Sequence, residues 1–201
     1  MPMRFMDDQV KDKILFMKKF VSNPRTIGSI APSSPFLAES IFSNIDWSRI
    51  GFVAELGAGT GVFTKKLIKK MGGGKKLLVF EIEPELRCRL QTQTGLTIYP
   101  DATELPQVLA DRGIRDVDLI ISSLPYAVLP RKTTETVLDG IVESLNPKGV
   151  FLAFQYSLHM KEPFEKIFDI VKTRFVPLNI PPAFVYECMW HYGNKKNKKI
   201  L

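Results

Sequence analysis

A glycine-rich segment at residues 57–61, Gly-Ala-Gly-Thr-Gly, carries the clearest chemical signal in the sequence. It follows the apolar run 52–56 and precedes helical periodicity at 62–71, which predicts a strand, a tight turn and a helix. Glycine suits such a turn because the backbone can adopt positive φ angles and a ligand can approach without meeting a Cβ atom. A dinucleotide-binding turn has its third glycine one residue later, where this chain has Val62. The residues of this turn assigned to ligand binding are Gly57, Ala58, Gly59 and Gly61.

Acidic residues accompany the first three predicted strands. Glu55 lies two residues before Gly57, and its carboxylate would repel a pyrophosphate but attract the ammonium and sulfonium groups of S-adenosylmethionine. Glu81 ends the second strand, where a carboxylate can accept hydrogen bonds from ribose hydroxyls, and Asp101 follows the third, placed to accept from an adenine amino group. We therefore predict that the cofactor is S-adenosylmethionine. The other residues assigned to its site are Ile82, Ala102 and Ser122.

The fourth predicted strand leads into a turn, Ser-Leu-Pro-Tyr at residues 123–126. Open α/β sheets bind their substrates at this end of the strands. Proline stiffens the turn, and Tyr126 is expected to present an aromatic face near the methyl donor. Tyr126 and Ser123 are therefore the candidate catalytic residues, and Leu124 and Pro125 are assigned to substrate binding.

Four further residues complete the predicted substrate site. Tyr156, like Tyr126, can contact a methylated cation or can pack at the end of a strand. His159 titrates near neutrality and is a candidate base, with a structural or surface role as the alternative. Ser33 and Ser34 are placed at the pocket entrance, although a role in the turn and cap before the next helix also explains them.

The elements that must position these residues alternate along the chain. The pattern predicts strands at 52–56, 77–81, 96–99, 117–122 and 150–155, and helices at 36–45, 62–71, 84–93, 103–111, 132–145 and 161–172. Two more strands, at 174–177 and 184–189, follow without a helix between them. The predicted fold is α/β: a Rossmann-like, seven-stranded, mostly parallel sheet with helices on both faces and an antiparallel C-terminal strand pair.

Length and composition predict one globular domain spanning residues 1–201, and the predicted cofactor makes it a methyltransferase domain. Of the 201 residues, 45% are hydrophobic, which is ample for a packed core. The sequence has no apolar run of about 18 residues and no signal peptide, so we expect a cytoplasmic protein. Its two cysteines lack Cys-x-x-Cys spacing, so no metal site is predicted.

Both ends of the chain are basic and contribute most of its net charge of +7. Apolar residues recur at helical spacing over 8–21, which predicts an amphipathic helix within the N-terminal segment 1–24. This helix can lie in a membrane interface or pack on the domain's own core. The lysine-rich tail, 194–201, can contact an anionic surface or remain solvated.

The predicted cofactor residues resemble those of class I S-adenosylmethionine-dependent methyltransferases, over roughly residues 50–155. The turn at 123–126 is also similar to that of the ribosomal RNA adenine dimethyltransferases. Their Asn-Leu-Pro-Tyr turn holds an adenine amino group through the Asn and the adjacent backbone carbonyl. Ser123 replaces that Asn here, and the chain ends soon after its last predicted strand. Nucleic acid is therefore a less favoured partner.

A second resemblance, to the bacterial phospholipid N-methyltransferases, covers nearly the whole chain. The matching segments lie at 20–24, 28–34, 123–125, 154–156 and 181–186. This resemblance implies stepwise methylation of phosphatidylethanolamine toward phosphatidylcholine. It also implies a peripheral enzyme bound through its N-terminal helix to the anionic inner face of the cell membrane. The alternatives are an RNA adenine N6-methyltransferase and a small-molecule methyltransferase.

Overall fold

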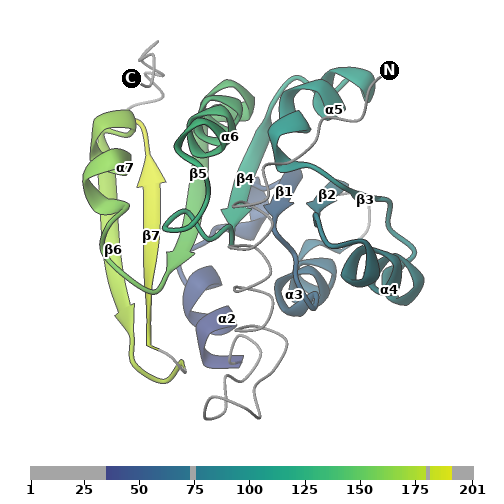
Figure 1. Cartoon of the computed structure of the whole chain (residues 1–201), viewed down its shortest axis with the longest axis horizontal. Helices are drawn as coiled ribbons and strands as arrows, with labels where there is room; N and C mark the ends of the chain where they lie inside the picture. The colour runs from purple at the N-terminus through teal and green to yellow at the C-terminus, as the bar shows by residue number, and fades with distance from the viewer. Residues whose placement is uncertain (1–34, 73–75, 180–181, 192–201) are drawn as a thin grey trace.

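The predicted seven-stranded sheet is present in the computed structural model, which describes residues 35–72, 76–179 and 182–191 (Figure 1). Its strand order is β3-β2-β1-β4-β5-β7-β6. The strands are β1 (Phe52–Leu56), β2 (Lys76–Phe80), β3 (Ile98–Tyr99), β4 (Val117–Ser122), β5 (Leu145–Gln155), β6 (Ile170–Val176) and β7 (Ala183–Met189). The first five pair in parallel, whereas β7 is antiparallel to both β5 and β6. The mostly parallel sheet and its antiparallel C-terminal pair are thus confirmed.

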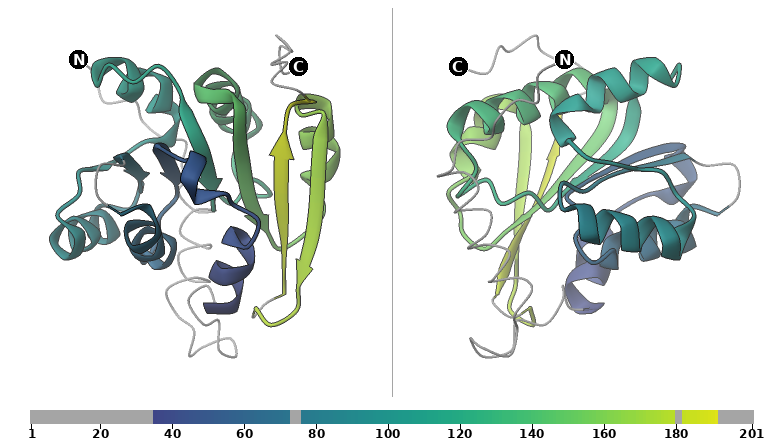
Figure 2. Two further views of the ribbon diagram at one scale, coloured as in Figure 1. Left: turned by 180° about the vertical axis from the view of Figure 1, so that it is seen from behind. Right: turned by 45° about the vertical axis from the view of Figure 1, so that its right-hand side comes forward.

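Helices cover both faces of the sheet, as predicted (Figure 2). Residues of α5, α6 and α7 pack in the core cluster on one face, and residues of α2, α3 and α4 pack against the other. The α-helices are α2 (Pro35–Phe42), α3 (Val62–Met71), α4 (Pro84–Thr94), α5 (Leu105–Asp111), α6 (Arg131–Ser144) and α7 (Lys161–Ile167). Two 3-10 helices, η1 (Trp47–Arg49) and η2 (Ala102–Glu104), precede β1 and α5.

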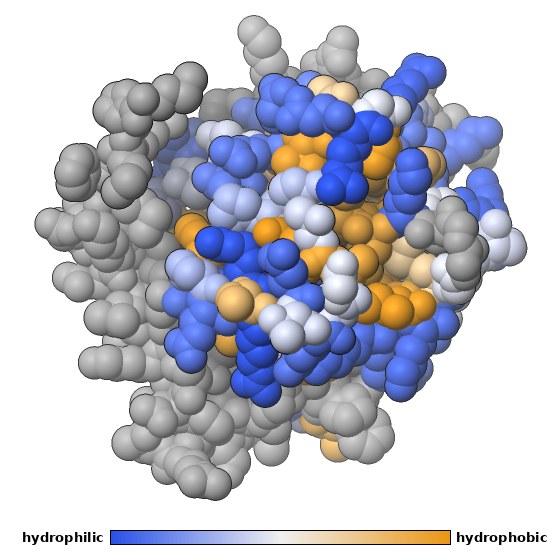
Figure 3. Space-filling view, turned by 90° about the vertical axis from the view of Figure 1, so that its right-hand side faces the viewer, coloured by the Kyte–Doolittle hydropathy of each residue, from blue (hydrophilic) through white to orange (hydrophobic). Residues whose placement is uncertain are grey.

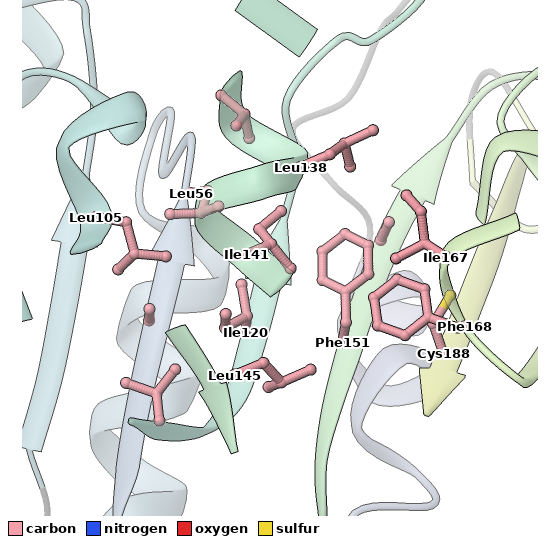
Figure 4. Packing of buried hydrophobic residues seen from close by; sticks show 14 of the residues in the cluster. Leu56, Leu105, Ile120, Leu138, Ile141, Leu145, Phe151, Ile167, Phe168 and Cys188 are labelled. Carbon is pink, nitrogen blue, oxygen red and sulfur yellow. The ribbon is translucent and has the colours of Figure 1, made fainter. Parts of the chain in front are cut away.

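The central strands are mostly apolar because both of their faces are covered. In β1, the neighbouring residues Val53 and Ala54 point to opposite faces, and neither is exposed to solvent. Figure 4 shows the larger cluster, in which Leu56, Ile120 and Phe151 of the sheet meet side chains of α5, α6 and α7. This double-sided core fixes the positions at which β1, β4 and β5 end.

The predicted helix at 161–172 is too long. α7 ends at Ile167, and β6 begins at Ile170. The backbone N–H of Asp169 donates to the carbonyl oxygen of Met189 (3.2 Å), and Ile170 pairs with the same residue. The end of the predicted helix has both helical periodicity and β-branched residues, and its pairing with β7 makes it a strand instead.

Other boundaries also differ from the prediction. α2 stops at Phe42 rather than reaching residue 45, and the Ser43 hydroxyl donates to the Ser40 carbonyl (3.0 Å) at its end. Ser side chains compete with the backbone in this way and favour helix termini. β5 begins at Leu145, directly after α6, rather than at residue 150.

Phe164 on α7 is the aromatic centre of the core beneath β5 and β7. Its side chain is fully buried, and its ring contacts those of Phe151 at 5.4 Å and Tyr186 at 5.2 Å between centroids. We expect Phe164→Ala to lower the free energy of unfolding by about 3–5 kcal/mol, measured by urea denaturation. Phe175→Ala is the control, because that side chain is 54% exposed and its loss should cost about 1 kcal/mol or less. Equal losses in the two variants would contradict this view of the core.

Candidate functional site

The glycine turn connects β1 to α3 in the way the sequence predicts. Gly57, Gly59 and Gly61 have φ values of +80°, +57° and +80°, in the left-handed region that favours glycine. The backbone N–H groups of Gly57 and Ala58 donate to the carbonyl oxygen of Phe80, at 2.9 and 3.0 Å. The turn is therefore anchored to the end of β2 and opens directly into the helix.

Each glycine of this turn faces different surroundings. A Cβ atom at Gly61 would lie 2.3 Å from Leu90 Cδ1, and one at Gly57 would lie 3.0 Å from Leu124 Cδ2. A Cβ atom at Gly59 would meet nothing within 4 Å. Close packing thus explains two of the glycines, whereas Gly59 borders open space that a ligand can occupy. The contact with Leu124 also places the cofactor turn beside the predicted acceptor turn.

Glu55 is a fully buried carboxyl group on β1. The Thr64 hydroxyl of α3 donates to its Oε2 at 2.7 Å, whereas its Oε1 has no hydrogen-bond partner among the described residues. Burial raises the pKa of Glu55 to about 7. A buried carboxyl with an unpaired acceptor fits a cationic ligand, because a nearby positive charge would offset the cost of ionising it.

Glu81, directly after β2, has a structural role that the sequence did not predict. Its Oε2 accepts a hydrogen bond from the N–H of Gly59 at 2.6 Å, and its Oε1 accepts from the N–H of Glu83 at 2.8 Å. The carboxylate therefore supports the glycine turn in addition to its predicted position near a ribose. Its neighbour Ile82 is 50% exposed and offers an apolar surface beside it.

Asp101 and Ala102 follow β3 at the position that the sequence predicts. Asp101 Oδ1 accepts hydrogen bonds from the backbone N–H (2.9 Å) and the hydroxyl (2.8 Å) of Thr103, so Asp101 caps η2. Because β1 to β4 are parallel, Glu55, Glu81, Asp101 and Ser122 lie along one edge of the sheet. The side that carries β3, α4 and α5 exposes hydrophobic patches between hydrophilic residues (Figure 3).

The turn after β4 is held by several hydrogen bonds. The Ser123 N–H donates to the Leu56 carbonyl at 2.9 Å, which ties the turn to the end of β1. The Leu124 N–H donates to Ser122 Oγ at 3.3 Å, and the same oxygen lies 2.8 Å from the Tyr126 hydroxyl. Ser123 Oγ is buried and has no hydrogen-bond partner among the described residues. The hydroxyl predicted to be catalytic is therefore not engaged by another of these residues.

Tyr126 differs from its predicted role. Its side chain is only 4% exposed, and its ring packs edge-to-face against Phe164 at 6.1 Å between centroids. Burial raises the pKa of its hydroxyl well above the usual range. The expectation of an aromatic face presented to the methyl donor is wrong for this structure, because the ring is part of the core around α7.

This burial gives a direct prediction for Tyr126→Phe. The ring keeps its packing, and only the hydrogen bond to Ser122 is lost, so the free energy of unfolding should fall by about 1 kcal/mol. The rate of methyl transfer should stay within about threefold of the wild type. Chemical denaturation and initial-rate measurements test the two statements. A 100-fold loss of turnover in a folded variant would show that Tyr126 acts directly in methyl transfer.

Tyr156 and His159 lie beyond β5. Tyr156 is 40% exposed and packs edge-to-face on Phe154 at 5.4 Å between centroids. His159 Nδ1 lies 2.7 Å from Ser157 Oγ, and partial burial lowers the pKa of its imidazole. A lowered pKa keeps the ring neutral at physiological pH, in the form that can accept a proton. Among the described residues, no hydrogen bond joins His159 to the turn at 123–126.

Gln155 was given no role in the sequence analysis. It is the last residue of β5, is 5% exposed, and donates from Nε2 to the carbonyl oxygens of Leu124 (2.8 Å) and Phe154 (2.7 Å). In the sequence it is a polar residue at the end of an apolar strand, within the segment 154–156 that resembles the phospholipid N-methyltransferases. Its partner across the sheet becomes apparent only once β4 and β5 are paired.

Several predictions fall on other parts of the chain. Ser33, Ser34, the helix at 8–21 and the tail at 194–201 lie outside the described residues. Within the described ranges, no helix is long and apolar enough to cross a membrane. The same ranges contain no cluster of three or more His, Cys, Asp and Glu side chains that could hold a metal ion.

Known proteins resemble this chain in sequence and in fold. No protein-family model matches the sequence. The ornithine lipid N-methyltransferase of Singulisphaera acidiphila is 33% identical over 185 residues, covering 89% of this chain and 96% of the relative. The ribosomal RNA small subunit methyltransferase A of Thermotoga neapolitana is 24% identical, over 81% of this chain and 66% of the relative. The O-methyltransferase TomG of Streptomyces achromogenes, solved with S-adenosylmethionine, has a TM-score of 0.63 at 11% identity, covering 93% of this chain and 92% of TomG.

The sheet order and the glycine turn, with carboxylates after successive strands, define a class I S-adenosylmethionine-dependent methyltransferase. Their arrangement agrees with the cofactor predicted from Glu55 and the turn. The chain belongs to this class and, within it, to the same family as the ornithine lipid N-methyltransferase.

Proposed function

We propose that this methyltransferase transfers methyl groups to the primary amine of a lipid headgroup at a membrane surface. The observation that carries the proposal is the 33% identity to an ornithine lipid N-methyltransferase over 96% of that relative. Phosphatidylethanolamine, the acceptor implied by the earlier resemblance, and ornithine lipid both present a primary aliphatic amine. The shared chemistry is therefore an aminolipid, and the two headgroups are separated by experiment.

The cofactor residues fit S-adenosylmethionine. Glu55 would face its cationic groups, Gly59 gives backbone access, and Glu81, Ile82 and Asp101 would line the adenosine. Bound S-adenosylmethionine supplies an activated methyl group: the C–S bond breaks with its electron pair passing to sulfur, and the amine lone pair forms the C–N bond. The headgroup ammonium must lose its proton beforehand, and that proton finally reaches the solvent. The protein's contribution is to align the nitrogen with the methyl carbon and to exclude water.

Ser123 is proposed to orient the acceptor. Its hydroxyl is buried and unpaired among the described residues. The next residue, Leu124, lies close to Gly57, so the acceptor turn and the cofactor turn are neighbours. A hydroxyl oxygen can accept one N–H hydrogen bond from the amine and so point the nitrogen lone pair at the methyl group. His159, with its lowered pKa, is the proposed route for the proton that the headgroup loses.

Exposed apolar side chains support membrane contact at this edge of the sheet. Tyr156 and Leu158 follow β5 and are 40% and 48% exposed, and Phe175 and Leu178 near the end of β6 are 54% and 64% exposed. Because β6 runs parallel to β5, all four lie at the edge that carries the acceptor turn. We propose a peripheral enzyme whose site opens toward the bilayer, with the basic N-terminal helix that the sequence predicts and the lysine-rich tail on anionic lipid.

The alternative acceptor is an adenine base of RNA. It is favoured by the similarity to ribosomal RNA small subunit methyltransferase A, of whose length this chain covers 66%. Against it, Ser123 replaces the Asn of the dimethyltransferase turn and supplies no side-chain amide. We therefore keep RNA as a second candidate.

A labelled-methyl transfer assay tests the proposal. The full-length protein and radiolabelled S-adenosylmethionine are incubated with vesicles in which an anionic carrier lipid is mixed with phosphatidylethanolamine, ornithine lipid or phosphatidylcholine. A separate reaction contains unmodified ribosomal RNA. We expect label in at least one aminolipid and none in phosphatidylcholine, whose nitrogen is already quaternary. Label confined to RNA would refute the proposal, and replacing the anionic carrier lipid by a neutral one should lower the rate on vesicles.

A further inference from the structure

Gln155 uses both of its amide hydrogens at the carboxyl end of β5. Nε2 donates to the Leu124 carbonyl at 2.8 Å and to the Phe154 carbonyl at 2.7 Å. A side-chain amide nitrogen carries two hydrogens, so neither remains for a ligand. At 5% exposure, the group is held inside the sheet edge rather than on its surface. This geometry also fixes which end of the amide is the nitrogen, because both neighbours are acceptors.

The Leu124 carbonyl is left without a free acceptor position. Besides Gln155, it accepts a hydrogen bond from the Tyr126 N–H at 3.0 Å. A carbonyl oxygen has two lone pairs, so both of its acceptor positions are filled within the chain. Ser122 Oγ is likewise engaged, by the Leu124 N–H and the Tyr126 hydroxyl. The side-chain acceptor that the turn still offers is Ser123 Oγ, which has no partner among the described residues.

We propose that Gln155 is a positioning residue that saturates the Leu124 carbonyl and thereby restricts the acceptor to an aliphatic amine. An amino group on an aromatic ring is planar, with two in-plane N–H groups and a lone pair delocalised into the ring. Localising that lone pair for transfer requires acceptors for both hydrogens, and the filled carbonyl cannot supply one. An aliphatic amine has a localised lone pair, and one acceptor such as Ser123 Oγ is enough to orient it.

This inference rests on the proposed function, because it names the chemical class of the amine at the same site. The role of Gln155 depends only on the hydrogen-bond acceptors around residues 123–126 and not on attachment of the amine to a lipid. A soluble aliphatic amine would satisfy it as well as a lipid headgroup.

Gln155→Glu is the decisive variant. It keeps the size of the side chain but places a carboxylate oxygen against two carbonyl oxygens, so two hydrogen bonds become repulsions. We expect kcat on the amine acceptor to fall at least 100-fold, while the Kd for S-adenosylhomocysteine, measured by calorimetry, stays within twofold. Gln107→Glu is the matched control, because the Gln107 amide donates to Asp111 on the exposed face of α5 (2.7 Å). That variant should leave both quantities unchanged.

Hydrogen exchange gives a readout that needs no substrate. In the wild type, both side-chain amide hydrogens of Gln155 should exchange slowly in NMR spectra, and those of Gln107 rapidly. Gln155→Glu should speed exchange of the Tyr126 backbone amide, whose acceptor is the displaced Leu124 carbonyl. Rapid exchange of the Gln155 amide in the wild type would overturn the proposal even if the variant failed to fold.

An acceptor assay distinguishes the proposed aminolipid function from the proposed role of Gln155. Wild-type enzyme is offered vesicles that contain phosphatidylethanolamine or ornithine lipid, free ethanolamine and an adenine-containing RNA oligonucleotide. Transfer to ethanolamine but to no lipid would reject the aminolipid function and leave the role of Gln155 intact. Transfer to adenine would overturn the inference, as would a folded Gln155→Glu enzyme with unchanged kcat. We expect the wild type to transfer methyl groups to an aliphatic amine, either on a lipid or as free ethanolamine. We expect Gln155→Glu to lose this transfer.

Discussion

Gly61→Ala is expected to abolish measurable cofactor binding and to lower the free energy of unfolding by about 3 kcal/mol. Its φ of +80° costs an alanine about 1–2 kcal/mol before any contact is considered. The new Cβ would also lie 2.3 Å from Leu90 Cδ1. Leu90 is only 2% exposed and lies in one buried cluster with Val79 and Ile98, so its side chain has little room to give way. We expect the overlap to displace the turn and so to disturb the cofactor site.

Calorimetric titration with S-adenosylhomocysteine and urea denaturation measure these two effects. Gly95→Ala is the matched control, because Gly95 also has a left-handed φ (+70°) but a Cβ there meets nothing within 4 Å. That variant should lose only the backbone contribution, about 1 kcal/mol, and should bind cofactor normally. If Gly61→Ala also bound cofactor with wild-type affinity, the turn would not be the cofactor site.

Local signals explain why much of the fold was predictable from the sequence. The strand at 52–56 and the helix at 62–71 match β1 and α3 in full, because each depends on residues that are close in the chain. The same holds for the glycine turn, whose positive φ angles require a residue type visible in the sequence. The start of β6 was missed, because pairing with β7, rather than the composition of the segment, makes it a strand.

The site residues that sequence reasoning misjudged depend on contacts across the sheet. Tyr126 was expected at the surface of the site, but α7 supplies a core position for its ring. Gln155 was overlooked because its partner, the Leu124 carbonyl, is brought to it by the pairing of β4 with β5. Such contacts leave no periodic trace in a single sequence, so the acceptor side of the site was harder to predict than the cofactor side.

Glu55→Gln is expected to remove the pH dependence that Glu55 gives to both stability and cofactor binding. Burial raises the pKa of the Glu55 carboxyl from the ordinary 4.5 to about 7 in the folded protein. Between these values the native state binds more protons than the unfolded state, so the free energy of unfolding falls as pH rises from about 4.5 to about 7. The complete loss is about 3 kcal/mol for the ligand-free protein. Without a titrating group, Glu55→Gln should match the wild type near pH 5 and exceed it at pH 8.

Cofactor binding should respond to pH in the opposite direction from stability. A cationic ligand favours the ionised carboxylate, so its affinity for the wild type should rise as pH increases through about 7. Glu55→Gln has no charge to offer, and we expect at least a tenfold weaker Kd at pH 8 with little change between pH 6 and 8. Glu162→Gln is the control, because the pKa of that exposed carboxylate is lowered by Lys166 and its loss cannot stabilise the protein at pH 8. Urea denaturation and calorimetry at pH 5, 6, 7 and 8 measure all three proteins. A Glu55→Gln protein that is less stable than the wild type at pH 8, yet binds cofactor equally well, would show that the buried carboxyl serves the fold rather than the ligand.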